Sequence, residues 1–245
     1  MNAMNKISLN EYQNYTRYVE NISFGEVYPR AVVNGMQSGE IFSDGKAVLI
    51  WHYCGFAWIC GEYSNVFLRE AERLKADARR RLVLFTGDER VSEFFERCGA
   101  SLGKRLFFRY TGAGAETALP EGFEIKPIGR RLFEELEGRV EPKLFWSDAD
   151  EFERNGKGFC VMNGSEPAAW AFFASTDGKE ADIGVEAAEK YRGRGLASAA
   201  ASAVIFAAVK EGLKPVWACD SGNKASQGLA RKLGFECCGE CRVIR

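Results

Sequence analysis

Six consecutive residues in the C-terminal half of the chain have the types needed to bind a phosphate group. Two of them are glycines, which lack a Cβ and let the backbone approach a ligand closely. A helix that begins at this point presents unpaired N–H groups and the positive end of its dipole. Two arginines add positive charge beside it. The pattern predicts a pyrophosphate site at Arg192-Gly193-Arg194-Gly195-Leu196-Ala197.

Two other kinds of phosphate-binding loop do not match the sequence. The chain contains no Gly-x4-Gly-Lys-Ser/Thr, which excludes a Walker loop. It contains no Gly-x-Gly-x-x-Gly after a first strand, which argues against a dinucleotide-binding fold. The loop taken alone leaves a second interpretation open, a plain helix start on a basic surface.

The elements around the loop must hold it in place. We expect a strand over 180–185 before the loop and a long helix over 196–210 after it. Alternating and apolar patterns upstream predict a strand at 123–128, a helix at 129–140 and a hairpin that turns at Asn163-Gly164. Downstream we expect a strand at 215–220, a helix at 224–234 and a closing strand at 235–244.

The N-terminal half shows a related pattern. We expect adjacent strands at 46–53 and 55–60, a helix over 64–78, a strand at 81–87, a helix capped by Asp88, and a strand at 102–110. Residues 27–35 fit a strand or a loop. Both halves end in a strand, a helix, a glycine and a final strand, which predicts an internal duplication. The segment TGAGAETALPEG, residues 111–122, shows no periodicity. It predicts three regions: an N-terminal region 1–112, a linker 113–122 and a C-terminal region 123–245.

Composition limits the classes of partner. The chain has 245 residues and a net charge of -1, so we expect neither nucleic acid nor a membrane surface as a partner. Its longest apolar run, 14 residues from Leu196, is too short to span a bilayer. The first residues lack the pattern of a secretory signal, so we expect reduced cysteines in a cytoplasmic protein. The sequence leaves a homodimer open.

Over residues 123–245 the chain resembles the GNAT superfamily of N-acetyltransferases. Two motifs carry this resemblance. The first is Arg192-x-x-Gly195-x-Ala197, and the second is DSGNKASQGLARKLGF, which contains Asn223 and ends in Gly234-Phe235. The stretches FWSDADEFERNGKGFCVMNGSEPAAWAF and EADIGVEAAEKYRGRGLASA are similar to the branch that includes zwittermicin A resistance acetyltransferases. Members of that branch carry an additional N-terminal region.

The resemblance implies a mixed α/β fold, with a GNAT fold in the C-terminal half and a degenerate GNAT-like N-terminal half. It implies transfer of an acetyl group from acetyl-CoA, as a cosubstrate, to a primary amine of a small molecule. In the family the strand before the loop splays from its neighbour and pairs with the pantetheine arm, here Ile183, Gly184 and Val185. Asn223 and Ser226 would face the cofactor, and a helix-capping pair is the other interpretation of these two.

The amine must lose a proton and the leaving thiolate must gain one. Glu180, Asp182 and Glu186 flank the strand, and Glu180 and Glu186 are our candidates for the base. Many family members place a tyrosine where this chain has Ala230. The resemblance therefore leaves the acid open between Ser226, Tyr191, water and an unassisted thiolate.

Other residues are weighed against ordinary structural roles. Trp146 is the candidate for contact with a cationic substrate, while Trp170 and Trp217 are expected in the core. The acidic residues at 148–153 fit a helix start. No metal is expected, because the Cys-x-x-Cys at 238–241 lacks partner ligands and the single histidine, His52, lies in an apolar run.

Two rival functions remain open at this stage. One is an acyl-CoA-binding sensor or inactive partner, which the alanine at position 230 favours. The other is an aminoacyl-tRNA-dependent transferase, a class that also pairs two GNAT-like halves. The near-neutral charge and the lack of a basic stripe argue against the second.

Overall fold

The computed structural model describes residues 3–77, 80–112 and 117–245 and divides into two compact units. Unit 1 holds the chain up to residue 106 together with 220–222 and 239–245, and unit 2 holds 107–219 and 223–238. Ala78 of the predicted helix and residues 113–116 of the predicted linker lie outside the described residues. The three sequence regions proposed above stay a prediction.

Unit 1 is built on a mixed sheet with the strand order β1-β2-β3-β4-β5, followed by the end of β12 and the start of β6. β3 and β4 form the predicted adjacent antiparallel pair, and β5 runs parallel to β4. Its elements are β1 (Asn5–Lys6), η1 (Leu9–Tyr15), α1 (Thr16–Val19), α2 (Val27–Val33), β2 (Gly39–Ser43), β3 (Ala47–His52), β4 (Phe56–Gly61), α3 (Asn65–Asp77), β5 (Val83–Thr86), α4 (Glu89–Arg97) and β6 (Leu102–Tyr110).

Alternation along β3 sends side chains to two different cores, since successive strand residues point to opposite faces. Leu49 packs with Phe67 of α3 and Phe95 of α4. Val48 and Ile50 pack on the other face. This explains why the run AVLIWH is buried throughout.

Residues 27–33 form helix α2, so the expectation of a strand or loop there was wrong. The β-branched valines suggested extended structure, but six of the seven residues are buried and tertiary packing decides the conformation. Pro29 is tolerated because it stands in the first turn, where a backbone N–H has no intrahelical partner. Arg30 N then donates the regular bond to Glu26 O, at 3.1 Å.

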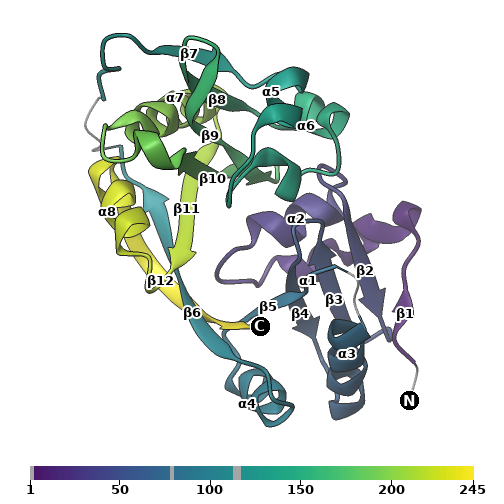
Figure 1. The fold of residues 1–245 in the computed structure, drawn as a ribbon. Helices are drawn as coiled ribbons and strands as arrows, with labels where there is room; N and C mark the ends of the chain where they lie inside the picture. The colour runs from purple at the N-terminus through teal and green to yellow at the C-terminus, as the bar shows by residue number, and fades with distance from the viewer. Residues whose placement is uncertain (1–2, 78–79, 113–116) are drawn as a thin grey trace. The chain divides into compact units, whose positions relative to one another are not determined.

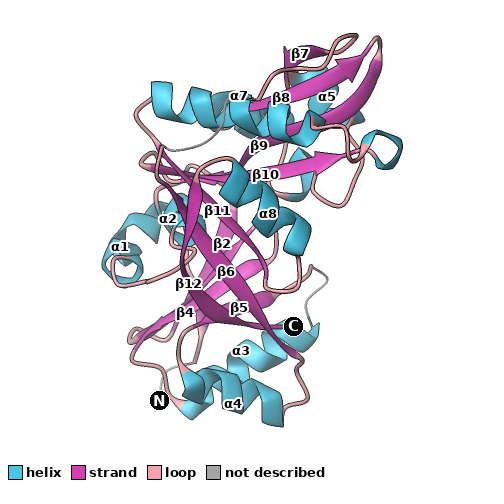
Figure 2. Cartoon of the chain, turned by 90° about the vertical axis from the view of Figure 1, so that its left-hand side faces the viewer, coloured by secondary structure: helices cyan, strands magenta, loops and turns pink. Residues whose placement is uncertain are grey.

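Unit 2 has the strand order β12-β6-β11-β10-β9-β8-β7. Helix α7 packs across β8, β9 and β10 (Figures 1 and 2). The elements are β7 (Glu124–Pro127), α5 (Arg130–Glu135), η2 (Pro142–Leu144), α6 (Ala149–Asn155), β8 (Gly158–Asn163), β9 (Glu166–Thr176), β10 (Glu180–Ala187), η3 (Glu189–Tyr191), α7 (Leu196–Lys210), β11 (Lys214–Asp220), α8 (Lys224–Lys232) and β12 (Phe235–Ile244).

Most predicted elements of unit 2 are confirmed, with two local corrections. The β8–β9 hairpin turns at Gly164-Ser165, one residue later than predicted, because Asn163 pairs with Glu166 and Gly164 supplies the positive φ of 59°. Helix α5 ends at Glu135 rather than near residue 140. Leu136 is extended (φ −67°, ψ 127°) and buried, so the chain leaves the helix to place this side chain in the core.

The two units repeat one order of elements, as the predicted duplication requires. In each, a strand leads through a helix to a parallel neighbour, β4 to β5 in unit 1 and β10 to β11 in unit 2. A second helix follows and ends on a glycine with a φ of 87°, at Gly99 and at Gly234. Within the described residues, no helix is both long and apolar enough to cross a membrane.

Two alanine substitutions should move stability in opposite directions. Gly99→Ala should lower the free energy of unfolding by about 1–2 kcal/mol, because an L-residue at this positive φ is strained. Gly228→Ala, inside α8, should raise it by about 0.5–1 kcal/mol. A Cβ at either position would meet no heavy atom within 4 Å, so both effects come from the backbone. Urea denaturation measures both, and equal signs would contradict the account.

Candidate functional site

Strands β10 and β11 separate halfway along their length. Their parallel ladder covers three pairs and ends with Asp182 opposite Val216. Within the described residues, β10 continues to Ala187 with β9 as its one strand partner. In both ribbon views β11 takes a different direction from β10 (Figures 1 and 2). The far half of β10 therefore has one edge without a strand partner.

The backbone groups on that edge can be identified from the hydrogen-bond alternation. Ala188 N donates to Ala168 O at 3.0 Å, so even-numbered residues of this stretch bond to β9. The N–H and C=O groups of Ile183 and Val185 then point away from β9. A bond of 3.3 Å from Arg192 Nε to Ala187 O agrees with this alternation.

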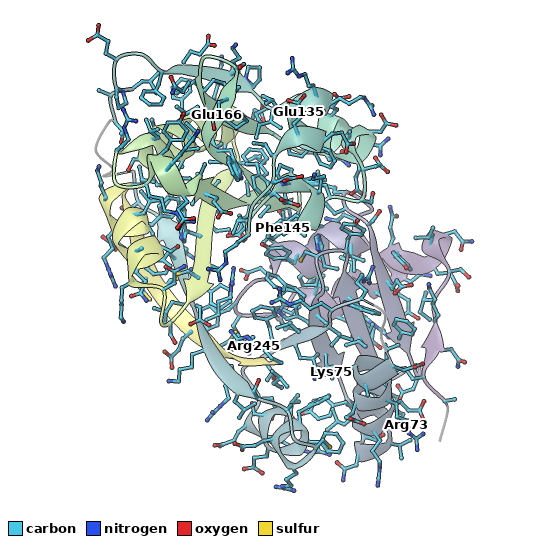
Figure 3. The ribbon with its side chains drawn as sticks, viewed as in Figure 1. Arg73, Lys75, Glu135, Phe145, Glu166 and Arg245 are labelled. Carbon is cyan, nitrogen blue, oxygen red and sulfur yellow. The ribbon has the colours of Figure 1, made fainter. Side chains whose placement is uncertain are left out.

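A neighbouring aromatic side chain leaves little room for a Cβ at Gly184. It lies opposite Phe172 on β9, and a Cβ there would stand 3.0 Å from Phe172 Cζ. The Phe172 ring in turn packs edge-on against Phe145, which is labelled in Figure 3. An aromatic ring of β9 therefore approaches the backbone closely at this glycine.

The loop that follows β10 leaves the start of α7 open. Gly195 is the N-cap, with a φ of 80° and no capping side chain. The helix bonds begin with Ala199 N donating to Gly195 O at 3.1 Å, so the N–H groups of the preceding turn have no intrahelical partner. Gly193 also has a positive φ of 77°, and a Cβ at either glycine would meet no heavy atom within 4 Å.

The corresponding helix of unit 1 begins differently. Ser64 precedes α3, and its Oγ accepts the Phe67 N–H at 3.2 Å. Three residues separate β4 from α3, whereas eight residues with two glycines separate β10 from α7. A helix that begins without a side-chain cap, next to glycines, can bind an anionic group such as a pyrophosphate. Helix α7 of unit 2 begins in this way, whereas α3 of unit 1 does not.

The two arginines of the loop have different surroundings. The Arg192 side chain is 57% exposed and its Nη2 stands 3.8 Å from Glu186 Oε1. The Arg194 guanidinium lies over the rings of Phe123 and Tyr191, 4.9 Å and 5.8 Å from their centroids. Arg192 therefore lies beside an acidic residue at the end of β10, whereas Arg194 lies over two aromatic rings.

Tyr191 anchors the loop to the β8–β9 hairpin. Its hydroxyl donates to Glu166 Oε2 and accepts from Asn163 Nδ2, both at 2.8 Å. The ion pair with Lys190, together with the Tyr191 hydroxyl, lowers the pKa of Glu166, which Figure 3 labels. The contacts of Glu166 and Asn163 with this loop were not predicted, since nothing in their spacing links them to a tyrosine about 25 residues later.

The acidic residues of β10 share one face of the strand, because side chains two residues apart lie on the same side. Glu186 accepts the Val140 N–H from the segment that precedes α6, so by alternation Gly184, Asp182 and Glu180 lie on the face toward that segment. Asp182 is buried at the last paired position of the ladder. Glu186 lies beside the loop, and its Oε2 accepts the Val140 N–H at 2.6 Å.

The start of α8 supplies a polar pair beside β11. Asn223 is the N-cap and its Oδ1 accepts the Ser226 N–H at 3.1 Å, which confirms the capping interpretation. Ser226 Oγ accepts the indole N–H of Trp217 at 3.0 Å. Trp217 is buried, as expected of a core residue, and Ala230 has no exposed surface.

Trp146 is fully buried and donates its indole N–H to Phe173 O at 2.7 Å. A side chain without exposed surface cannot contact a substrate in this arrangement, so we do not keep Trp146 in the site. The apolar packing of its ring against Phe152 explains this position. The acidic residues that follow form a helix start, with Asp148 capping the Glu151 N–H of α6 at 2.8 Å.

His52, which lies in an apolar run of the sequence, is a fully buried core residue. Burial, with a contribution from Arg80, lowers its pKa to about 3, so the imidazole is neutral. Its Nδ1 accepts the Cys54 N–H at 3.1 Å. All eight cysteines are free thiols. Among residues 3–77, 80–112 and 117–245, no group of three or more His, Cys, Asp or Glu residues is arranged to hold a metal, and the metal-free expectation stays a prediction.

Comparisons with known proteins agree with this arrangement. The family model described as GNAT acetyltransferase matches residues 24–244. The uncharacterized N-acetyltransferase YdfB of Bacillus subtilis is 32% identical over 120 residues, which are 48% of this chain and 46% of YdfB. The chain thus matches about half the length of that relative.

Solved structures resemble the whole chain. A GCN5-related N-acetyltransferase-like protein from Streptococcus suis has a TM-score of 0.77 at 23% identity, over 97% of this chain and 99% of its own. A tandem GNAT protein from the clavulanic acid biosynthesis pathway has a TM-score of 0.62 at 12% identity, over 99% and 98%. These likenesses confirm the predicted mixed α/β fold, with GNAT-like structure across both halves.

Removing the anchor of the loop should destabilise the protein. Tyr191→Phe leaves the ring in place but removes the hydroxyl and its two hydrogen bonds to Glu166 and Asn163, so the free energy of unfolding should fall by about 1–3 kcal/mol. Tyr110→Phe is the control, because the Tyr110 ring packs on Phe235 and no hydrogen bond of its hydroxyl is found in the described part of the chain. Equal losses in the two variants by urea denaturation would refute the anchoring role.

Proposed function

Because the chain belongs to the GNAT acetyltransferase family, we propose that it moves the acetyl group of acetyl-CoA to a primary amine of a small molecule. The observation that carries the proposal is the pairing of two open backbone features in unit 2. One is the uncapped start of α7 at Gly195, and the other is the unpaired edge of β10 after Asp182. A long ligand with an anionic end and an amide-containing arm suits this combination.

The residues proposed to hold acetyl-CoA follow from these two features. Backbone groups of Ile183 and Val185 would bond to the pantetheine arm, while Gly184 sets the fit of the strand against Phe172. Asn223 and Ser226 would border the arm from α8. The pyrophosphate would lie on the loop and the first turn of α7, at Arg192, Gly193, Arg194, Gly195, Leu196 and Ala197.

The direction of the cofactor separates the two proposed bases. The phosphate end lies where β10 meets the loop, so the thioester would lie toward the closed end of the gap, at Asp182. Glu186 is four residues from Asp182, about 13 Å along a strand. Glu180 lies on the same face beyond the closed end. We therefore propose Glu180 as the base that takes the amine proton, through water, and not Glu186.

The proposed acid is Ser226. Its Oγ already accepts a hydrogen bond from Trp217, which leaves its own proton to be donated toward the leaving thiolate. Tyr191 does not suit this role, since its hydroxyl is committed to Glu166. The N–H of Ile183, which follows the closed end of the gap and points away from β9, would donate to the thioester carbonyl oxygen and stabilise the charge that develops there.

The remaining assignments are proposals of the same kind. A small antibiotic-like amine and the zwittermicin-type branch rest on the sequence resemblance alone. Eight free thiols support a reducing, cytoplasmic location. A homodimer stays open. The match to the acetyltransferase family favours a working transferase over an inactive acyl-CoA sensor, and the charge balance disfavours a tRNA-dependent transferase.

A charge at the start of α7 should abolish cofactor binding. Gly195→Glu places a carboxylate where the pyrophosphate would lie, and the dissociation constant for acetyl-CoA should rise by about a hundredfold or more. Gly212→Glu is the matched control: it follows the other end of the same helix, has a φ of 76° and is equally open. Titration calorimetry gives both constants. Similar affinities in the two variants would refute the assignment of the loop.

Removing the proposed base should slow turnover without loss of cofactor. Glu180→Gln should lower kcat by about a hundredfold or more, because the ammonium form of the acceptor is not nucleophilic. Release of free thiol across a panel of amines measures it, with acetyl-CoA affinity checked by calorimetry. Glu124→Gln, on exposed strand β7, is the control. An undiminished kcat in Glu180→Gln would remove this residue from the mechanism.

A further inference from the structure

Glu186 joins two segments of unit 2 that are distant in sequence. Its Oε2 accepts the backbone N–H of Val140 at 2.6 Å, and its Oε1 lies 3.8 Å from Arg192 Nη2. The side chain is 12% exposed, compared with 57% for Arg192. One partly buried carboxylate thus contacts both the segment before α6 and the cofactor loop.

The segment at 138–141 is fixed closely against the end of β10. Trp170 Nε1 donates to Val140 O at 2.7 Å, and Gly138 N donates to Glu141 Oε2 at 2.6 Å. A Cβ at Gly138 would stand 2.8 Å from both Glu186 Oε2 and Trp170 Cζ2. The contact leaves no room for a side chain, so the position of the segment depends on Glu186 and Trp170.

This segment borders the face of β10 on which the reaction is proposed. Glu186, Gly184 and Glu180 share that face by strand alternation. Phe145, a few residues further along the chain, packs on Phe172 next to Gly184. A shift of the 138–141 segment would therefore change the surface beside the gap between β10 and β11.

The Arg192 side chain already has two partners within the protein. Its Nε donates to Ala187 O at 3.3 Å and its guanidinium faces Glu186. A pyrophosphate on the loop would compete with the Glu186 carboxylate for the same cation, and the carboxylate itself would repel the phosphates. Glu186 therefore opposes the binding of an anion at the loop.

We propose that Glu186 is a positioning residue that couples the cofactor loop to the 138–141 segment. Its hydrogen bond to the Val140 N–H fixes the 138–141 segment beside the reacting face of β10. Its carboxylate attracts the Arg192 guanidinium until a bound pyrophosphate takes over as the partner of Arg192. The proposal rests on the proposed function, since it takes the loop to bind acetyl-CoA. It replaces the role of base, for which Glu186 lies at the wrong end of the gap.

Two substitutions separate the charge of Glu186 from its hydrogen bond. Glu186→Gln keeps an oxygen that accepts the Val140 N–H but removes the charge that faces Arg192. The dissociation constant for acetyl-CoA should fall by about threefold, the size typical of a partly exposed ion pair. Glu186→Ala should show the same tightening, but the amide proton of Val140 should exchange with solvent at least about tenfold faster. In Glu186→Gln its exchange should stay within about threefold of the wild type.

A double substitution tests whether the effect passes through Arg192. In an Arg192→Ala background, Glu186→Gln should tighten acetyl-CoA less than in the wild-type background, because the competition for the cation is gone. An acetyl-CoA affinity that is unchanged or weaker in Glu186→Gln would overturn the proposal. A hundredfold fall in thiol release by Glu186→Gln, with Val140 exchange unchanged, would also overturn it and restore the role of base.

The proposed function fails by a different result. A wild-type protein that does not bind acetyl-CoA would overturn both the proposed function and the coupling to the loop. The exchange rate of the Val140 amide proton does not depend on the ligand. Equal exchange in Glu186→Ala and the wild type would therefore overturn the anchoring part even where acetyl-CoA binds normally.

Discussion

The structure of unit 2 depends on one constraint, that backbone N–H and C=O groups need partners. The ladder between β10 and β11 satisfies them up to Asp182 and Val216 and then stops. Beyond that point β10 has one bonded edge and one open edge, and the helix that follows begins without a capping side chain. The open edge of β10 and the uncapped start of α7 therefore both present backbone groups without a partner from the same β-sheet or helix. A bound cofactor could hydrogen-bond to both.

Unit 1 shows what happens when the same connection is closed. Its parallel ladder also ends after three pairs, with Trp58 opposite Phe85. These two rings stack with their centroids 5.0 Å apart, and both are buried. At the start of α3 the Ser64 hydroxyl bonds a backbone N–H, whereas the glycine at the start of α7 has no side chain to do so. In unit 1 a side-chain hydroxyl therefore bonds the helix start, and a stacked aromatic pair stands where the parallel ladder ends.

The sequence predicts well where local rules and burial agree. The bounds of α7 match the helix predicted over 196–210, and Asp88 and Asn223 cap helices as their types suggest. It fails where tertiary packing overrides local preference, as in α2, whose valines are buried in a helix. The hairpin turn moves by one residue because strand register, and not the Asn-Gly pair, sets it.

The candidate site was predictable only in its backbone part. A glycine loop before an apolar helix has a sequence pattern, whereas the contacts of Glu186 with Val140 and of Tyr191 with Glu166 join residues far apart in the chain. Trp146 shows the reverse error. A tryptophan beside acidic residues suggested a cation-binding surface, but its ring fills the core and the acids cap and pair around α6. Burial is a property of the whole fold that one sequence does not display.

The most direct test of the account is a titration of the protein with acetyl-CoA, followed residue by residue through the chemical shifts of its backbone amides. The account predicts saturable shifts at Gly195, Leu196 and Ala197 together with Ile183 and Val185, since the open helix start and the open strand edge bind one ligand. Shifts confined to other residues, or no shifts at millimolar acetyl-CoA, would contradict it.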